Sequence, residues 1–120
     1  MRPAAAPAHN LASVQRLVAA TPDRVVFRRA FTTEVVANLD DVDPRTARLT
    51  ILDALCRLIP DDYAHTLTAQ APPADVYGWR DGRGRGWYIK FTVLPDGRLF
   101  VISFHPPEAS LRTRSGVVRM

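Results

Sequence analysis

The sequence is poor in cysteine and histidine, which limits the kinds of site it can build. Its single cysteine, Cys56, rules out an internal disulfide, and the apolar helical pattern around it predicts a buried side chain. The three histidines are scattered along the chain, without the spacing that zinc ligands show. We therefore expect neither a metal nor another cofactor.

Long apolar runs are also missing. No stretch approaches the roughly 20 apolar residues that a membrane-spanning helix requires. The N-terminal sequence MRPAAAPAHN lacks the apolar core of a signal peptide. These absences predict a cytoplasmic protein without a membrane partner.

Lysine is nearly absent, because Lys90 stands alone beside fifteen arginines. Residues 1–74 hold eight basic and eight acidic side chains, whereas residues 75–120 hold eight basic and four acidic ones. The second segment therefore carries the whole formal net charge of +4. Charge gathered in one segment favours a polyanion or an acidic protein as the partner.

The chain begins with a segment of low complexity and continues into a helical pattern. Residues 1–9 are rich in alanine and proline and are expected to form a disordered tail. Asn10 suits the N-cap of a helix over residues 11–20, which ends before Pro22. The following RVVF predicts a short strand.

Two further helical patterns follow. In FTTEVVANL, the apolar side chains of Phe31, Val35 and Leu39 are spaced four apart and predict a stripe that faces the core. Asp43 can cap the next helix, and Pro44 suits its first turn. That longer helix is expected to run up to the next proline.

The apolar period then changes to two, which indicates strands. Helices that precede consecutive strands favour an α+β fold, with N-terminal helices packed on a small antiparallel sheet. Such a sheet can leave one face open to water. The domain is expected to span residues 10–105, and residues 106–120 lack a pattern and are expected to be a C-terminal tail. The predicted strands cover residues 63–68, 75–80, 87–94 and 99–104.

The register of the last hairpin decides which polar side chains share a face. If PDGR forms a four-residue loop, Tyr88 faces His105 and Lys90 faces Ser103. Alternation then places these four side chains in one polar cluster on the open face of the sheet.

The other side of the same hairpin is apolar in this register. Phe100, Ile102 and Phe104 would join the core beside the apolar residues of the preceding strand. A three-residue loop, PDG, with a bulge would instead bury Ser103 and His105. Since a slip that buries polar side chains is costly, we expect the first register.

The polar cluster has the residue types that RNA cleavage needs. Attack by the RNA 2′-hydroxyl requires a base, a cation and an acid, but no metal and no protein nucleophile. Tyr88, Lys90 and His105 can fill these roles, although the same residues also suit a polar surface without a task. Arginines can hold phosphates, and an aromatic ring can stack on a base. The candidates for RNA binding are Arg80, Arg83, Arg85 and Tyr77.

Five short segments stand in a notable order, namely LASVQRLV, DDYAHTLT, DVY, WYIKFTV and LFVISF. Their order and rough spacing resemble the MqsR-type toxins, which are mRNA interferases of bacterial toxin–antitoxin pairs. The resemblance spans roughly residues 10–105. It implies a RelE-like fold, metal-independent cleavage of messenger RNA at short motifs, and neutralisation by a cognate antitoxin.

The resemblance also assigns site positions. The family's tyrosine and lysine in a YLK-like strand match Tyr88 and Lys90. The family's lysine after an SF pair falls on His105, a residue type that titrates near neutral pH. Two more family positions, a lysine and a glutamine, fall on Ala64 and Ala74.

The fourth catalytic candidate is His65, which directly follows Ala64. In a regular strand, the side chains of His65 and Ala64 point to opposite faces of the sheet. A bulge in the strand would bring His65 to the face of the predicted site. One of the loop arginines, Arg80, Arg83 or Arg85, can supply the missing cation.

The sequence therefore predicts an endoribonuclease toxin with single-stranded mRNA and an antitoxin as partners. The alternative is a non-catalytic RNA- or protein-binding module on the same fold, which the two alanines favour. GRGRG is too short and follows the wrong element for a phosphate-binding loop, so a flexible loop is expected there.

Overall fold

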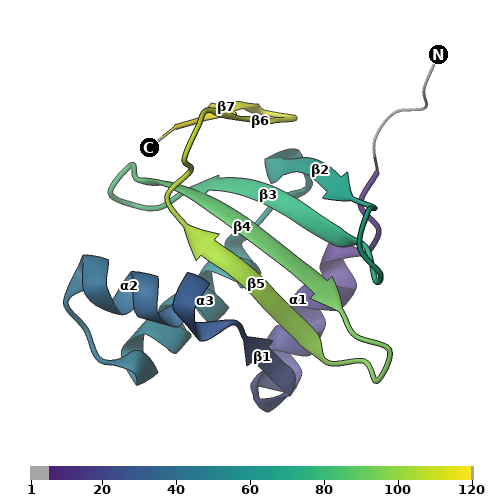
Figure 1. Ribbon diagram of the computed structural model, residues 1–120, viewed down its shortest axis with the longest axis horizontal. Coiled ribbons are helices and arrows are strands. Elements are labelled where there is room, and N and C mark those ends of the chain that lie inside the picture. Colours follow the sequence, from purple (N-terminus) through teal and green to yellow (C-terminus); the bar gives the residue numbers. More distant parts are fainter. Residues whose placement is uncertain (1–5, 120) are drawn as a thin grey trace.

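The helices of the protein gather on one face of a sheet, as the computed structural model of residues 6–119 shows (Figure 1). The fold is α+β, as expected from the order of the helical and strand patterns. The helical elements are α1 (Leu11–Ala20), η1 (Pro22–Arg24), η2 (Arg29–Phe31), α2 (Thr33–Asp40), α3 (Pro44–Arg57) and η3 (Pro60–Asp62), of which the η elements are short 3₁₀ turns.

The main sheet has five strands in the order β1-β5-β4-β3-β2. The four later strands are antiparallel, as expected, but β1 pairs in parallel with β5 and makes the sheet mixed. A small separate hairpin, β6 and β7, lies on the sheet face opposite the helices (Figure 1). The strands are β1 (Val25–Phe27), β2 (Tyr63–Leu67), β3 (Ala74–Arg80), β4 (Gly86–Val93), β5 (Leu99–His105), β6 (Leu111–Thr113) and β7 (Gly116–Val118).

The expected helix caps are present. The Asn10 side chain accepts the N–H of Ser13 at 2.9 Å, and the Asp43 carboxylate accepts the N–H of Thr46 at 2.7 Å. Each bond satisfies a backbone donor that has no partner inside the helix, which is worth about 1 kcal/mol.

The apolar stripe expected on α2 faces outward, so that prediction was wrong. Phe31 is 43% exposed and Leu39 is 51% exposed, whereas the helix buries Thr33 and Val36. The cause lies in the preceding turn, where the buried Thr32 donates its hydroxyl to the Arg28 carbonyl and fixes the direction in which the helix starts.

One side chain of helix α3 lies on a different face from the one predicted. Cys56 is exposed, which corrects the expectation of a buried thiol. Residues spaced three and four apart form the inner face of a helix, and a face centred on Ile51 and Leu55 turns Cys56 aside. The buried residues of α3 are Ala47, Ile51, Leu52, Ala54 and Leu55.

The hairpin of β4 and β5 combines both of the registers considered from the sequence. Next to the turn, Val93 pairs with Leu99, and the N–H of Leu94 donates to the Arg98 carbonyl. The loop is therefore the three-residue PDG, with Gly97 at φ 88°, a conformation that favours glycine.

Farther from the turn, the pairing shifts by one residue through a β-bulge. Lys90 pairs with Ser103, whereas the next residue of β4 pairs with Val101, so Ile102 is the inserted residue. The expected core positions were therefore partly wrong, since Phe100 is only half-buried, whereas Ile102 is buried but outside the main core cluster. The residues of β5 in that cluster are Leu99, Val101 and Phe104.

The segments expected to be tails are held by contacts. Residues 1–5 of the expected N-terminal tail lie outside the described residues, but Ala8 and His9 donate their backbone N–H groups to the buried Asp75 carboxylate. Residues 106–120, expected to lack structure, contain β6 and β7. Their weak sequence pattern follows from their short length, three residues each.

The β6–β7 hairpin rests on a glycine of the sheet. A Cβ atom at Gly78 would lie 2.8 Å from Cγ2 of Thr113 and 2.9 Å from Cδ2 of Leu111. The hairpin is also tied to β2, because the N–H of Arg114 donates to the Tyr63 carbonyl at 3.0 Å. The missing side chain at position 78 therefore makes room for the hairpin.

We expect Gly78→Val to displace β6 and β7 and to lower the free energy of unfolding by roughly 1–3 kcal/mol, the usual cost of overpacking. Gly82→Val is the matched control, because a Cβ at Gly82 meets no atom within 4 Å. Urea unfolding and hydrogen exchange of residues 111–118 measure both effects. Equal stability and equal exchange in the two variants would contradict this role for Gly78.

Candidate functional site

Four polar side chains lie together on the sheet face that the helices do not cover. Tyr88 pairs with His105 and Lys90 pairs with Ser103, which confirms the expected register at this end of the hairpin. Their neighbours in β4 and β5 alternate into the main core. The β-bulge is what allows Ser103 and His105 to face outward while Val101 stays buried.

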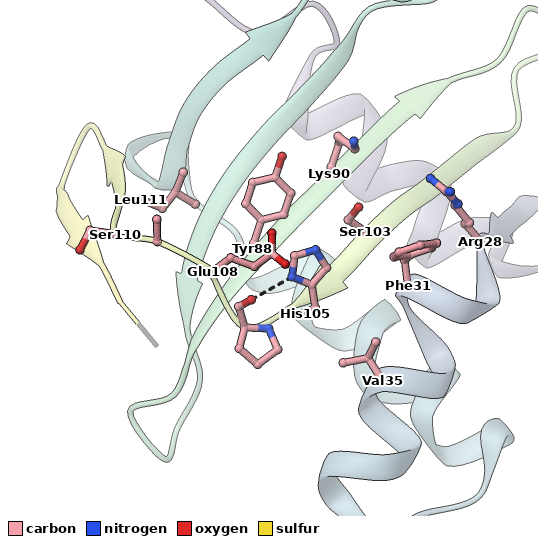
Figure 2. Close-up of a pocket in the computed structure, with 12 residues that line it drawn as sticks. Arg28, Phe31, Val35, Tyr88, Lys90, Ser103, His105, Glu108, Ser110 and Leu111 are labelled. Carbon is pink, nitrogen blue, oxygen red and sulfur yellow. Dashed lines mark hydrogen bonds between the residues drawn. The ribbon is translucent and has the colours of Figure 1, made fainter.

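The orientation of His105 is fixed by two contacts, which Figure 2 shows. Its ring stacks on Tyr88, with 5.1 Å between the ring centroids and 12° between the ring planes. Its Nδ1 lies 2.8 Å from the Pro106 carbonyl oxygen. A carbonyl only accepts, so Nδ1 carries the hydrogen, and Nε2 is the nitrogen left to exchange a proton.

Tyr88 is held in its protonated form. Burial raises the pKa of its hydroxyl, and the negative charge of Glu108 raises that pKa further. At neutral pH the phenol is therefore a hydrogen-bond donor and a possible acid, and it is not a base.

These side chains line a cavity of about 760 Å³ between the sheet, the η2–α2 region and the segment after β5. That volume is within the range of small-ligand sites in proteins. The lining combines a lysine, an arginine and a histidine with exposed apolar atoms, and Figure 2 shows Lys90, Ser103 and Arg28 along one side. The residues that line the cavity are Arg28, Phe31, Val35, Tyr88, Lys90, Ser103, His105, Pro106, Glu108, Ala109, Ser110 and Leu111.

Sequence patterns alone missed two charged residues of this cavity, Arg28 and Glu108. Arg28 follows β1, and its N–H donates to the Val101 carbonyl at 3.0 Å, so the parallel pairing of β1 brings it to the site. Only knowledge of that pairing could have placed it there. Glu108 comes from the segment that was expected to be a tail.

The loop arginines predicted to bind RNA are engaged elsewhere. Arg85 donates to Asp40 at 2.7 Å and to Asp81 at 2.9 Å, and Arg83 lies 3.8 Å from the Asp40 carboxylate. Arg80 donates to backbone carbonyls, including that of Val117 at 3.1 Å. None of the three lines the Lys90 cavity. The loop is therefore braced against α2 and β7, contrary to the expected flexibility.

Tyr77 and His65 also lie outside the cavity. Tyr77 is fully buried and stacks on Phe91 with 5.5 Å between the ring centroids, so it cannot stack on an RNA base. Strand β2 has a bulge between Tyr63 and His65, and this bulge brings His65 to the open face, contrary to the orientation expected for a regular strand. His65 is opposite Val76, which is opposite Lys90, so two strand spacings, roughly 10 Å, separate it from the lysine.

The two alanines at family site positions are both part of the packed structure. Ala74 is fully buried. Ala64 packs against a small apolar cluster that joins the sheet to the C-terminal hairpin. The hairpin therefore covers this part of the open face, and the polar groups are confined to the β4–β5 side. The buried residues of that cluster are Val76, Leu111 and Val118.

Within residues 6–119, no three His, Cys, Asp or Glu side chains are grouped in a way that could hold a metal ion. In the same part of the chain, no helix has the length and apolar character needed to cross a membrane. A comparison with protein-family models found no match, and neither did a comparison with curated proteins. Function is therefore inferred from the site and from the resemblance of the short sequence segments.

Asp81 organises the loop between β3 and β4. Burial acts to raise its pKa, but hydrogen bonds from the Trp87 indole, from the backbone N–H groups of Arg85 and Arg83, and from the Arg85 side chain outweigh burial and lower the pKa to about 2. An unfolded aspartate titrates near pH 3.9. The stabilising effect of this carboxylate is thus present above about pH 4 and is lost as the pH falls through about 2.

We expect the tryptophan fluorescence of the folded protein to change between about pH 4 and pH 2, because protonation of Asp81 weakens its bond with the Trp87 indole. Asp81→Asn should remove this change, and the Trp79→Phe background makes Trp87 the reporter. Asp53→Asn is the control, since Asp53 pairs with Arg57 on the exposed surface of α3. A transition that persists in Asp81→Asn would argue against this assignment.

Proposed function

We propose that the protein is an endoribonuclease that cuts single-stranded RNA through the RNA's own 2′-hydroxyl. The observation that carries the proposal is the arrangement of His105, whose Nδ1 is engaged by a backbone carbonyl while its ring borders a cavity beside Lys90. A histidine of fixed tautomer next to a cation suits proton transfer at a phosphate.

The reaction needs two proton transfers. The 2′-oxygen attacks phosphorus, the bond from phosphorus to the 5′-oxygen breaks, and the products carry a 2′,3′-cyclic phosphate and a 5′-hydroxyl. Neutral His105 accepts the 2′ proton at Nε2. Tyr88, which keeps its hydroxyl proton at neutral pH, donates to the departing 5′-oxygen.

Lys90 provides the charge stabilisation. Its ammonium group compensates the extra negative charge of the five-coordinate phosphorus, and Arg28, which lines the same cavity, attracts the RNA backbone. The loop arginines have no part in this scheme, because none of them lines the cavity.

The biological role that we propose is that of an mRNA interferase toxin acting in the cytoplasm and neutralised by a cognate antitoxin. The resemblance to MqsR-type toxins supports it through Tyr88, Lys90 and the base that follows the SF pair. A RelE-like description of the fold belongs to the same proposal.

A second candidate is a non-catalytic RNA-binding module. The packed alanines at positions 64 and 74 favour it, because they leave the site without two polar groups that the resemblance implies. Both candidates predict RNA binding, and only the first predicts strand cleavage.

Purified protein free of antitoxin should cut single-stranded RNA in the presence of EDTA and leave 2′,3′-cyclic phosphate ends. An oligonucleotide with 2′-deoxy or 2′-O-methyl sugars should stay intact, because the nucleophile is missing. Gel analysis of end-labelled oligonucleotides measures cleavage of the normal and the modified substrates, and chemical identification of the product ends tests for the cyclic phosphate. Binding without cleavage by folded protein would support the binding module.

His105→Ala should lower the cleavage rate roughly 10²-fold or more if His105 transfers a proton in the transition state. The variant should lose less than about 1 kcal/mol of stability, as is usual for a partly exposed site. Wild-type activity should rise with pH as the base loses its proton, whereas His105→Lys should be nearly inactive at neutral pH, because its protonated ammonium group cannot accept the 2′ proton.

His65→Ala is the matched control for His105→Ala, because His65 lies on the same face but away from the cavity. It should keep the wild-type rate and pH profile. Tyr88→Phe should keep the ring stack and lose rate through the missing hydroxyl. Full activity in His105→Ala at every pH would remove His105 from the mechanism.

A further inference from the structure

Phe31 is exposed although it begins an apolar stripe, and it lies at the rim of the proposed site. Its side chain is 43% exposed and lines the cavity together with Lys90 and His105. Figure 2 shows its ring beside Ser103, with the Arg28 side chain next to it. An exposed aromatic ring beside cations is a typical element of single-strand RNA sites.

The turn that presents Phe31 is well anchored. The N–H groups of Phe31 and Thr32 donate to the carbonyls of Arg28 and Arg29 at 3.0 and 3.2 Å, and the fully buried Thr32 adds its hydroxyl bond to the Arg28 carbonyl at 2.9 Å. Arg28 is itself bonded through its N–H to β5. The turn is thus tied directly to the strand that carries His105.

Arg28 and Phe31 form a stacked cation–π pair. The centre of the Arg28 guanidinium lies 4.1 Å from the Phe31 ring centroid, so a cation covers one face of the ring. Bases stack on aromatic rings and on guanidinium planes alike. The pair therefore offers apolar area and positive charge at a single place.

We propose that Arg28 and Phe31 form a nucleobase subsite, on which one base of single-stranded RNA stacks while its phosphate reaches Lys90 and His105. The inference rests on the proposed RNA function and adds the feature of RNA that the site recognises, an unpaired base. Phe31 and Arg28 thereby take the base-stacking role that the sequence analysis predicted for Tyr77, which is buried.

A protein partner on the same stripe is the rival explanation, and the position of the charges disfavours it. Leu39 continues the stripe with 51% exposure but does not line the cavity, whereas Phe31 and Val35 do. The cations of the cavity gather at the Phe31 end of α2, where they suit phosphates. Leu39, which is an exposed apolar residue of α2 outside the cavity, thus provides a control.

Binding of uncleavable RNA tests the subsite separately from catalysis. The probes are a 2′-O-methyl oligonucleotide and an abasic oligomer with the same number of phosphates, titrated by fluorescence anisotropy. Wild type should bind the base-bearing probe more tightly. Phe31→Ala should weaken that binding about tenfold, as expected for a lost stacking contact, and leave the abasic probe unchanged. Phe31→Trp should restore binding, and Leu39→Ala should match wild type.

Equal affinities of wild type and Phe31→Ala for the base-bearing probe, or an equal loss for both probes, would overturn the subsite. So would a shift in oligomeric state in both Phe31→Ala and Leu39→Ala with unchanged RNA binding, because that result identifies a protein-docking face. If wild type cleaves RNA and Phe31→Ala binds the base-bearing probe normally, the nuclease proposal stands and the subsite proposal is wrong. If wild type binds the base-bearing probe more tightly but does not cleave RNA, the subsite proposal stands and the nuclease proposal is wrong.

Discussion

The bulge at Ile102 is the constraint on which the site depends. The tight PDG turn sets one register for the start of β5, and that register alone would turn Ser103 and His105 into the core. The inserted residue changes the side on which the rest of the strand presents its side chains. One strand can therefore bury Val101 near the turn and still place His105 opposite Tyr88.

Two neighbouring segments shape the face that the bulge creates. The C-terminal hairpin covers β3 and β2, using the space over Gly78, and the segment before it forms one wall of the cavity with Glu108. The turn between β1 and α2 forms the other wall with Arg28 and Phe31. The site thus lies over β4 and β5, between the region that the hairpin covers and the turn that carries Arg28 and Phe31.

Local sequence patterns predicted the α-helices, the strands of the main sheet and one end of the hairpin, because periodicity and caps act over a few residues, but they missed β6 and β7. They placed Tyr88 opposite His105 correctly. They failed where a contact between residues far apart in the sequence determines the position of a side chain. Asp40 lies far from Arg85 in the sequence, so no local pattern could show that the arginine is taken up by an ion pair. The burial of Tyr77 was predictable from the strand pattern. Successive side chains of a strand point to opposite faces, so Tyr77 and its neighbour Val76 face opposite ways, and Tyr77 belongs to the main core.

The packed alanines bear on what kind of catalyst this fold can support. With Ala74 buried and Ala64 packed against the C-terminal hairpin, the β2 and β3 positions that the resemblance marks as catalytic supply no polar group. The reactive groups of the proposed site are then on β4, on β5 or on the segments that flank β1 and β5. A histidine suits a site with few polar groups better than a lysine does, because its two ring nitrogens can have different partners. Nδ1 holds the ring to the Pro106 carbonyl, and Nε2 remains for the substrate. In the mechanism that we propose, one residue thus combines positioning with proton transfer, which offsets the loss of polar neighbours.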